Sequence, residues 1–357
     1  MSNKPYIVIM AGGIGSRFWP YSRRHKPKQF LDVLGNGRTL LQMTFDRFSD
    51  IADPEQFLII TYSKYIDQVK EQLPELEDHQ ILSEPSRKNT ATCIAYATYK
   101  IFSQDPEADL IITPADHLVL EGEKFIETMN LALRVAQKPD RLVTIGITPD
   151  RPETGYGYIQ YIDRDGEEAF KVKTFTEKPN AALAKTFLES GDFVWNSGIF
   201  VWKAESLINA LRLHLQDLAE VFEEGLPQFN TKTELDFIQK AYTQVKSISI
   251  DYGVMEKSED VYVIPSDFGW SDLGSWTSLY EIREQDENKN VVEANALLYD
   301  TKTSFIKTDS DRLVVVRGLE NYLVNEEDNV LLICPIDSES EIRQFVADAK
   351  KKGVKFI

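Results

Sequence analysis

An apolar run at residues 5–11 leads directly into a glycine-rich segment, and this junction limits most strongly what the chain can fold into. The run is short and rich in β-branched residues, which is typical of a buried strand in a parallel sheet. In the next segment, Gly12-Gly13-Ile14-Gly15-Ser16-Arg17, glycines allow backbone N–H groups to approach phosphate oxygens closely. The junction therefore predicts a phosphate-binding loop at the end of a strand, and a purely structural turn is the alternative.

The loop fits neither of two familiar phosphate-binding patterns. A P-loop requires Gly-x4-Gly-Lys-Ser/Thr, and the segment does not have this spacing. A dinucleotide-binding loop requires Gly-x-Gly-x-x-Gly. Gly13 and Gly15 match that pattern, but Phe18 stands where the third glycine should be. We therefore expect a phosphate site of a different type.

Strand-like and helix-like segments alternate over the first 150 residues. Strands are expected at 56–62, 108–113 and 141–147, and helices at 63–73, 90–103 and 123–137. Such alternation predicts right-handed βαβ units and a parallel sheet covered by helices on both faces. The expected fold class is α/β.

The pattern changes after Thr154. Strands are expected at 156–162, 169–176 and 193–202, and helices at 181–189, 204–224 and 276–285. Short strands separated by polar turns follow at 297–299, 305–307, 313–316, 323–325 and 331–334, before a final helix at 339–352. Because the stretch 285–290 is charged and polar, we expect one domain at 1–285 and a second at 286–357.

Composition excludes several classes of protein. The 357 residues include 57 acidic and 40 basic side chains, and the formal net charge of −17 argues against nucleic-acid or anionic-membrane partners. The two cysteines, Cys93 and Cys334, are too few for a disulfide framework or a zinc site, which fits a reducing compartment. No apolar run approaches the ~18 residues of a membrane span. We expect a soluble, cytoplasmic protein.

A cluster of positive charge interrupts the acidic average. No acidic residue precedes position 32, whereas five cations fall within twelve positions: Arg17, Arg23, Arg24, Lys26 and Lys28. Clustered cations attract an anion to one place. The alternative is a solvated basic loop, which we expect for Arg23, Arg24 and Lys26 in particular.

Several motifs in the chain resemble those of a known enzyme family. Gly12–Arg17, Trp19-Pro20 and Pro27-Lys28-Gln29-Phe30-Leu31 together resemble the signature of the sugar-phosphate nucleotidylyltransferases, in the version typical of the mannose-1-phosphate guanylyltransferase branch. Further matches follow in order: Glu84-Pro85, Lys88-Asn89-Thr90, Pro114-Ala115-Asp116-His117, 151–159, Glu177-Lys178-Pro179, Trp195-Asn196-Ser197-Gly198, 250–257 and 270–276. Their order and number argue against coincidence.

The resemblance implies a fold and an activity. The fold is a Rossmann-like nucleotidyltransferase domain with a mixed, mostly parallel central sheet, followed by a small C-terminal β-helix-like domain. The activity is the transfer of GMP from GTP to α-D-mannose 1-phosphate, which gives GDP-mannose and pyrophosphate. Some family members also carry a C-terminal isomerase domain with a metal site built from His residues. Because the last His of this chain is His214, we expect the monofunctional form without isomerase activity.

The resemblance also assigns roles to residues. It implies that Arg17 and Lys28 are catalytic cations on the phosphates of the nucleotide. The expected nucleotide-binding residues are Gly12, Gly13, Gly15, Ser16, Glu84, Asn89 and Thr90, with Glu84 as the candidate acceptor for the N–H groups of guanine. The expected sugar-phosphate-binding residues are Gly155, Tyr156, Gly157, Glu177, Lys178 and Asn196. The expected Mg²⁺ ligands are Asp116 and Asp272.

The position of Asp116 supports this assignment independently. It follows the expected strand at 108–113 and so lies at the carboxyl end of a strand, where open α/β sheets bind ligands. Two carboxylates, completed by substrate phosphates and waters, are a common way to hold Mg²⁺. The alternative for Asp116 and Asp272 is a turn or a helix cap.

The chemistry of the implied reaction explains which side chains it needs. The attacking phosphate monoester is already ionised near neutral pH, because its second pKa is about 6. The protein must therefore align two polyanions and neutralise charge, and it needs no Ser-His-Asp or Cys-His device. For this reason we expect a structural role for His117.

Two alternatives stay open for the function. One is another sugar-1-phosphate nucleotidylyltransferase, which would use glucose 1-phosphate with UTP, dTTP or ATP. The other is a non-catalytic paralogue that senses nucleotide sugars, although such a protein commonly loses the cation or metal positions. We also expect a homodimer, because a second subunit would cover the exposed edge of a β-helix-like stack.

Overall fold

The computed structural model describes residues 4–164, 166–308 and 311–357. Its contacts divide the chain into two compact units. The first contains the chain up to Gly12, Thr44–Ala115 and Val119–Trp270, and the second contains Gly13–Met43, Asp116–Leu118 and Ser271–Ile357. The second unit thus combines three segments that are far apart in the sequence. A division into domains at 1–285 and 286–357 stays a prediction.

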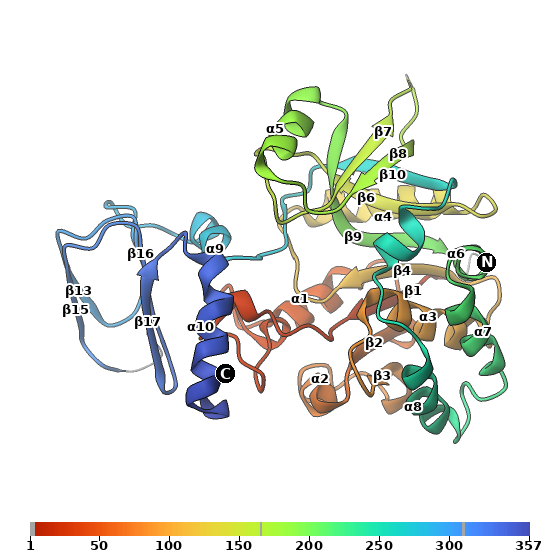
Figure 1. The fold of residues 1–357 in the computed structure, drawn as a ribbon, viewed down its shortest axis with the longest axis horizontal. Helices are drawn as coiled ribbons and strands as arrows, with labels where there is room; N and C mark the ends of the chain where they lie inside the picture. The colour runs from red at the N-terminus through yellow and green to blue at the C-terminus, as the bar shows by residue number, and fades with distance from the viewer. Residues whose placement is uncertain (1–3, 165, 309–310) are drawn as a thin grey trace. The chain divides into compact units, whose positions relative to one another are not determined.

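Within the described residues, the first unit is built on a nine-stranded sheet in the order β3-β2-β1-β4-β9-β6-β10-β8-β7 (Figure 1). The strands are β1 (Tyr6–Met10), β2 (Phe57–Tyr62), β3 (Ile81–Glu84), β4 (Asp109–Pro114), β6 (Leu142–Ile147), β7 (Tyr158–Ile162), β8 (Phe170–Thr176), β9 (Phe193–Lys203) and β10 (Val261–Ser266). β9 runs antiparallel to β4 and β6, and β8 runs antiparallel to β10 and β7. The other strands share one direction, which confirms the expected mixed, mostly parallel sheet.

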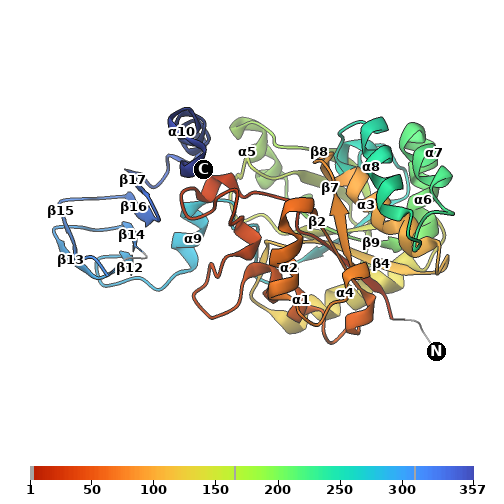
Figure 2. The same cartoon turned by 90° about the horizontal axis from the view of Figure 1, so that it is seen from below.

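Helices cover both faces of this sheet. On one side lie α3 (Asn89–Phe102), α6 (Ala204–His214), α7 (Gln216–Glu224) and α8 (Glu234–Gln244), and on the other lies α4 (Gly122–Ala136) (Figure 2). The remaining helices up to Ser190 are α1 (Leu40–Arg47), α2 (Ile66–Gln72) and α5 (Ala181–Ser190). Strand residues such as Val8 and Ile112 pack with Ile94 and Tyr96 of α3 in a fully buried core, and this apolar burial is the main source of stability.

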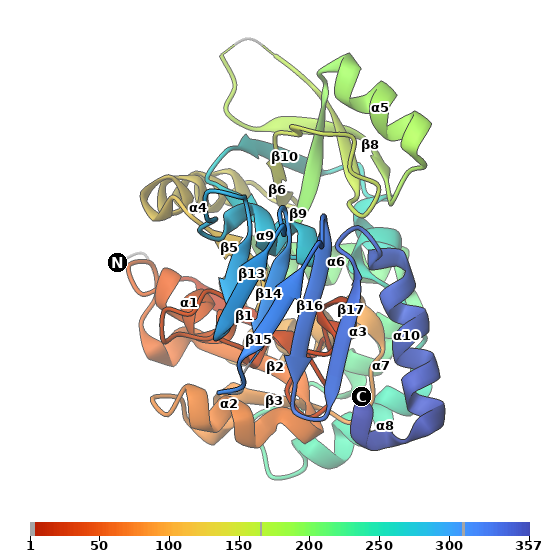
Figure 3. The same ribbon diagram turned by 90° about the vertical axis from the view of Figure 1, so that its left-hand side faces the viewer.

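The second unit contains a C-terminal stack of short strands (Figure 3). β12 (Val291–Glu293), β14 (Phe305–Thr308) and β16 (Tyr322–Glu327) pair in parallel, and β17 (Val330–Pro335) runs antiparallel beside β16. In a separate sheet, β13 (Ala296–Tyr299) pairs in parallel with β15 (Val314–Arg317). Successive passes of the chain therefore stack strand upon strand, and the expected C-terminal β-structure is confirmed.

A single tryptophan, Trp276, packs at the centre of the core of the second unit. Trp276 begins α9 (Trp276–Ile282) and is fully buried. Its ring centroid lies 5.4 Å from that of Phe18, next to the glycine-rich loop, and 5.4 Å from that of Phe305 in β14. α10 (Glu339–Lys352) adds Ile342 to the same core. The glycine-rich segment and the C-terminal strands thus share one hydrophobic core.

Some elements differ from the expectations. The helix expected at 204–224 is broken into α6 and α7, because Leu215 adopts φ −136° and ψ 52°, which are not helical. The helix expected at 276–285 ends at Ile282, because Arg283 is extended and its guanidinium binds Leu34 O and Glu293. Sequence patterns also missed α1, α8, β3 and β10. Among the residues that the structure describes, no helix is long and apolar enough to cross a membrane.

Candidate active site

The glycine-rich loop takes its shape from one close approach. Gly15 has φ +66°, and a Cβ atom at this position would lie 2.3 Å from Cβ of Lys28, so only glycine fits without strain. The Lys28 N–H donates to Ile14 O at 3.3 Å, and Gln29 Nε2 donates to Gly13 O at 3.0 Å. Space around the Cα of Gly13 is open. The segment that contains Lys28 therefore packs against one side of the loop, and the side of the loop at Gly13 stays open.

Lys28 is a buried cation with three directed contacts. Its residue is 3% exposed, and its Nζ donates to Asp116 O and Asp116 Oδ2 at 3.0 Å each and to Asp272 O at 2.5 Å. The same Nζ lies 5.6 Å from the ring centroid of Phe18. Because a buried ammonium is costly without partners, these contacts fix the positions of both aspartates around it.

The two predicted metal ligands, Asp116 and Asp272, therefore approach the same ammonium. Burial alone would raise the pKa of Asp116, but the Lys28 ammonium and, to a smaller extent, His117 outweigh it and hold the pKa below its usual value. Asp272 Oδ1 accepts the N–H of Gly274 at 2.8 Å. A Cβ atom on Gly274 would lie 2.5 Å from Asp272 Oδ2, so this glycine makes room for the carboxylate.

These groups line one cavity of about 270 Å³ in the second unit. Its lining residues are Gly15, Ser16, Arg17, Phe18, Lys28, Asp116, His117, Asp272, Leu273, Gly274 and Arg343. The structure thus brings together the loop, both predicted catalytic cations and both predicted metal ligands. Sequence reasoning missed Arg343, because nothing in its local pattern distinguishes it from an ordinary surface residue of a helix.

One expectation about the basic cluster is wrong, and it concerns Arg23. It was expected to be solvated, but it is only 2% exposed. Its guanidinium donates to Glu327 O and to Asn329 Oδ1, at the turn between β16 and β17. Arg23 therefore ties the N-terminal segment of the second unit to its C-terminal strands. The other two side chains, Arg24 and Lys26, are exposed as expected.

In the first unit, Glu84 at the end of β3 lies beneath Gly12. A Cβ atom on Gly12 would lie 3.0 Å from Glu84 Oε2, and the Tyr242 hydroxyl donates to Glu84 Oε1 at 3.0 Å. Burial raises the pKa of Glu84 to about 7, although the bond from Tyr242 and the charge of Arg87 partly oppose the rise. The Arg87 Nε in turn donates to Gly12 O at 3.1 Å. Arg87 therefore bonds to the backbone of Gly12, and Glu84 packs closely beside this glycine.

Two further predicted nucleotide-binding residues begin α3. Asn89 has φ +66°, and its Oδ1 accepts the N–H of Thr90 at 2.9 Å. The Thr90 hydroxyl accepts the N–H of Ile250 at 2.9 Å. The start of α3 is therefore joined to the segment at 250–255, and Asn89 is exposed beside it.

The predicted sugar-phosphate-binding residues gather around Asn196 in the first unit. Its backbone N–H donates to Gly157 O at 2.8 Å, and its Nδ2 donates to Asp251 Oδ1 at 2.8 Å. A Cβ atom on Gly157 would lie 2.6 Å from Glu177 Oε2, and Glu177 pairs with Lys178. The structure therefore brings Gly157, Glu177, Lys178 and Asn196 together.

Asp251 is a member of this group that sequence reasoning did not select as a site residue. Burial raises its pKa, and the nearby Glu177 carboxylate raises it further. Buried carboxyl groups next to a second carboxylate are frequent in functional sites. The signal that could have found it is the motif at 250–257, which contains it.

The loop at 155–157 is completed by aromatic contacts. The ring of Tyr156 packs edge-to-face against Trp195, with centroids 5.1 Å apart, and against Trp270 at 5.2 Å. Gly155 N–H donates to Glu153 Oε1 at 2.8 Å. These contacts position the loop beside β9, which carries Asn196.

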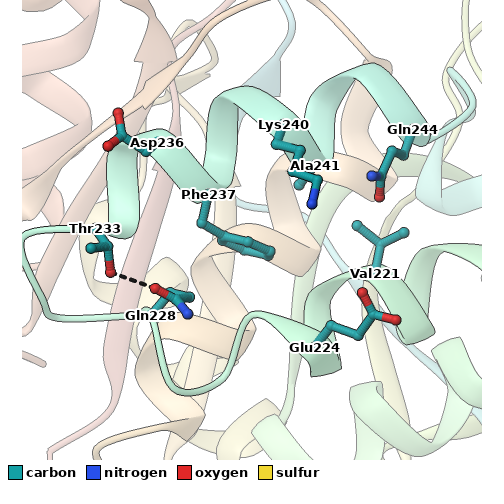
Figure 4. Close-up of a pocket in the computed structure, with 9 residues that line it drawn as sticks. All are labelled: Val221, Glu224, Gln228, Thr233, Asp236, Phe237, Lys240, Ala241 and Gln244. Carbon is teal, nitrogen blue, oxygen red and sulfur yellow. Dashed lines mark hydrogen bonds between the residues drawn. The ribbon is translucent and has the colours of Figure 1, made fainter.

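Another cavity, of about 360 Å³, lies between α7 and α8 (Figure 4). It is lined by Val221, Glu224, Gln228, Thr233, Asp236, Phe237, Lys240, Ala241 and Gln244. The Thr233 hydroxyl donates to Gln228 Oε1 at 2.5 Å at its edge. None of the predicted site residues is among these nine, so this cavity is separate from the predicted chemistry.

Comparisons with known proteins agree with these motifs. The family described as Nucleotidyl transferase matches residues 6–289. A curated relative from Escherichia coli named mannose-1-phosphate guanylyltransferase is 35% identical, over 99% of this chain and 78% of its own length. A solved structure from Thermus thermophilus, described as a mannose-1-phosphate geranyltransferase, is similar with a TM-score of 0.86 and 32% identity, covering 97% of this chain and 99% of that one. A structure from Helicobacter pylori described as mannose-6-phosphate isomerase is similar with a TM-score of 0.61 and 28% identity. The match covers 75% of this chain and 99% of that one.

Proposed function

Because the chain belongs to the nucleotidyl transferase family and, within it, to the mannose-1-phosphate guanylyltransferases, we propose that it transfers GMP from GTP to α-D-mannose 1-phosphate. The products are GDP-mannose and pyrophosphate. The observation that carries the proposal is the cavity of the second unit, where Arg17, Lys28, Asp116 and Asp272 meet at the glycine-rich loop. Backbone amides, fixed cations and paired carboxylates are the groups that phosphoryl transfer requires.

The reaction is an in-line displacement at the α-phosphorus. An oxygen of the sugar phosphate forms a bond to this phosphorus while the bond to the bridging oxygen of the β-phosphate breaks, and the electron pair leaves with pyrophosphate. Arg17 and Lys28 align the phosphates and offset their charge. No proton has to be removed from the nucleophile, so we assign His117 no role as a general base.

The residues of this cavity fit Mg²⁺. Asp116 and Asp272 offer hard carboxylate oxygens, and within the described ranges no group of three or more His, Cys, Asp or Glu side chains could hold a metal ion. The remaining ligands would therefore be substrate phosphates and waters, which is a common arrangement for Mg²⁺. When bound, the ion neutralises charge on the phosphates. Lys28 holds Asp116 in place and keeps it ionised.

Recognition of the two substrates is proposed for the first unit. Asn196, Glu177 and Asp251 offer amide and carboxylate partners to the hydroxyls of the sugar, and Lys178 offers a charge to its phosphate. Glu84 is the proposed acceptor for guanine. Its burial beneath Gly12 also supports a second task, which is to position the loop backbone.

The experiment that tests the function is pyrophosphate release from GTP and mannose 1-phosphate in the presence of Mg²⁺. Preference for glucose 1-phosphate with UTP, dTTP or ATP would favour the other branch of the family. Tight binding without turnover would favour a sensing paralogue. The presence of Arg17, Lys28, Asp116 and Asp272 in one cavity supports catalysis over sensing.

Three further properties belong to this proposal. A homodimer is supported by exposed apolar side chains on β13 and β15, namely Leu297, Tyr299 and Val315, and light scattering at the mass of a single chain would refute it. A cytoplasmic location is supported by the two cysteines, both free. We also expect this 357-residue chain not to convert fructose 6-phosphate to mannose 6-phosphate, because it has no His after His214.

A further inference from the structure

The C-terminal helix α10 is held at the glycine-rich loop by its apolar side chains. Ile342 is 1% exposed and packs in the same core as Phe18 and Trp276, and Phe345 and Val346 pack against that core. α10 contacts the short turn at Ser16–Phe18, and it lies beside the red N-terminal segment in Figure 1. Because Ile342 fixes the rotation of the helix, the residue after it has a defined direction.

That residue is Arg343, which lines the cavity with Ser16, Arg17 and Lys28. It is exposed, and among the side chains that the structure describes none accepts a hydrogen bond from it or pairs with it. Lys28, by contrast, is buried, and its ammonium already contacts Asp116 and Asp272. Arg343 thus lines this cavity as an exposed cation, and no described side chain pairs with it.

We propose that Arg343 is a phosphate-binding residue of the active site and contacts the β- and γ-phosphates of the nucleotide, which leave as pyrophosphate. This inference rests on the proposed function. The α-phosphorus has to react near Asp116 and Asp272, whereas Arg343 is an exposed residue of the cavity lining, which leaves it for the outer phosphates. A guanidinium suits this place because it binds two phosphate oxygens at once.

Charge supports the same assignment. The cations Arg17 and Lys28 only balance the charges of Asp116 and Asp272, so without a further cation the protein groups of the cavity have no net charge. Arg343 makes the sum of their charges positive, which favours binding of a triphosphate. The C-terminal segment would therefore contribute directly to binding of the leaving group, and not only to the stability of the second unit.

The test measures binding of pyrophosphate with Mg²⁺ to the full chain by calorimetry. Arg343→Ala should raise the Kd about tenfold or more, and Arg343→Lys should recover part of the loss. The matched control is Lys350→Ala, which removes an equal charge from an exposed position on α10 outside the cavity and should change the Kd less than about twofold. Equal affinities of Arg343→Ala and Lys350→Ala, or no binding to the wild type, would overturn the proposal.

Kinetics in the reverse direction separate binding from a structural effect. Arg343→Ala should raise the KM for pyrophosphate and leave the KM for GDP-mannose and the melting temperature unchanged. A merely structural role would lower the melting temperature and shift both KM values, and that result would contradict the proposal. If the wild type does not turn over GTP and mannose 1-phosphate, the proposed function fails, whereas the calorimetric comparison still decides the role of Arg343.

Discussion

The Nζ atom of Lys28 lies 3.0 Å from Oδ2 of Asp116, although 88 positions separate the two residues in the sequence. The same ammonium binds the backbone oxygen of Asp272. One buried cation therefore contacts both residues that we propose for Mg²⁺, Asp116 through its carboxylate and Asp272 through its backbone. We therefore propose two roles for Lys28, which are to bind the phosphates and to position the residues of the metal site.

We expect Lys28→Ala to lower kcat by ~10³-fold or more, because cations that neutralise transferred phosphates commonly contribute this much. The loss also leaves Asp116 without its closest positive partner. Arg24→Ala is the matched control, because Arg24 is exposed and belongs to the same basic cluster. Steady-state kinetics measure kcat and KM for both variants. An effect of Lys28→Ala that is confined to KM would mean that Lys28 only attracts substrate.

Gly15→Ala should destabilise the protein by about 1–3 kcal/mol, because alanine at φ +66° is strained and its Cβ would collide with Lys28. Gly13→Ala is the control, since nothing lies within 4 Å of a Cβ atom at that position. Thermal unfolding followed by circular dichroism measures both variants. Equal melting temperatures for the two would show that the close approach of Gly15 to Lys28 does not constrain the loop.

The raised pKa of Glu84 predicts a pH dependence of stability. A carboxyl whose pKa rises on folding, here from 4.5 to about 7, stabilises the protein below pH 4.5, and this contribution is lost as the pH rises through 7. Wild type should therefore lose on the order of 3 kcal/mol relative to Glu84→Gln between these pH values.

The difference in melting temperature between Glu84→Gln and wild type should accordingly increase from pH 4.5 to pH 7. Glu55→Gln, at an exposed position, serves as the control and should show no such trend. A difference that stays constant with pH would contradict the burial-driven shift of Glu84.

Asp251→Asn should raise the KM for mannose 1-phosphate by about tenfold, because Asn196 Nδ2 would then donate to a neutral amide oxygen and the negative charge beside the sugar site would be gone. The KM for GTP should change much less. Asp260→Asn, at an exposed position in the next turn of chain, controls for the loss of a negative charge. A parallel rise in both KM values would argue against a specific role in the sugar site.

Periodicity predicted most of the individual elements. The helix expected at 90–103 is α3 at Asn89–Phe102, and the strand expected at 305–307 is β14 at Phe305–Thr308. These succeed because local patterns of apolar residues decide them. The break at Leu215 between α6 and α7 was missed, because a single non-helical residue leaves the apolar period of the flanking helices intact.

The sequence predicted those residues of the cavity that lie in recognisable motifs. The cavity of the second unit contains Arg17, Lys28, Asp116 and Asp272, which the resemblance had selected. The sequence did not predict Arg343 as a site residue, because only the packing of α10 brings it to the loop. The burial of Arg23 was not predicted for a similar reason, because its hydrogen-bond partners lie some 300 positions away in the sequence. Contacts between distant segments have no local signature.

The most direct test of the proposed function measures pyrophosphate release by the wild-type chain and by Asp116→Asn and Asp272→Asn. It is run with Mg²⁺ for each pairing of GTP, UTP, dTTP and ATP with mannose 1-phosphate and glucose 1-phosphate. Asp50→Asn, at an exposed position, is the control. We predict that the wild type and the control turn over GTP with mannose 1-phosphate fastest, and that both site variants lose this activity while they stay folded. Preference for another pair would contradict the proposed substrates, and near-wild-type activity of either site variant at saturating Mg²⁺ would contradict the proposed metal site.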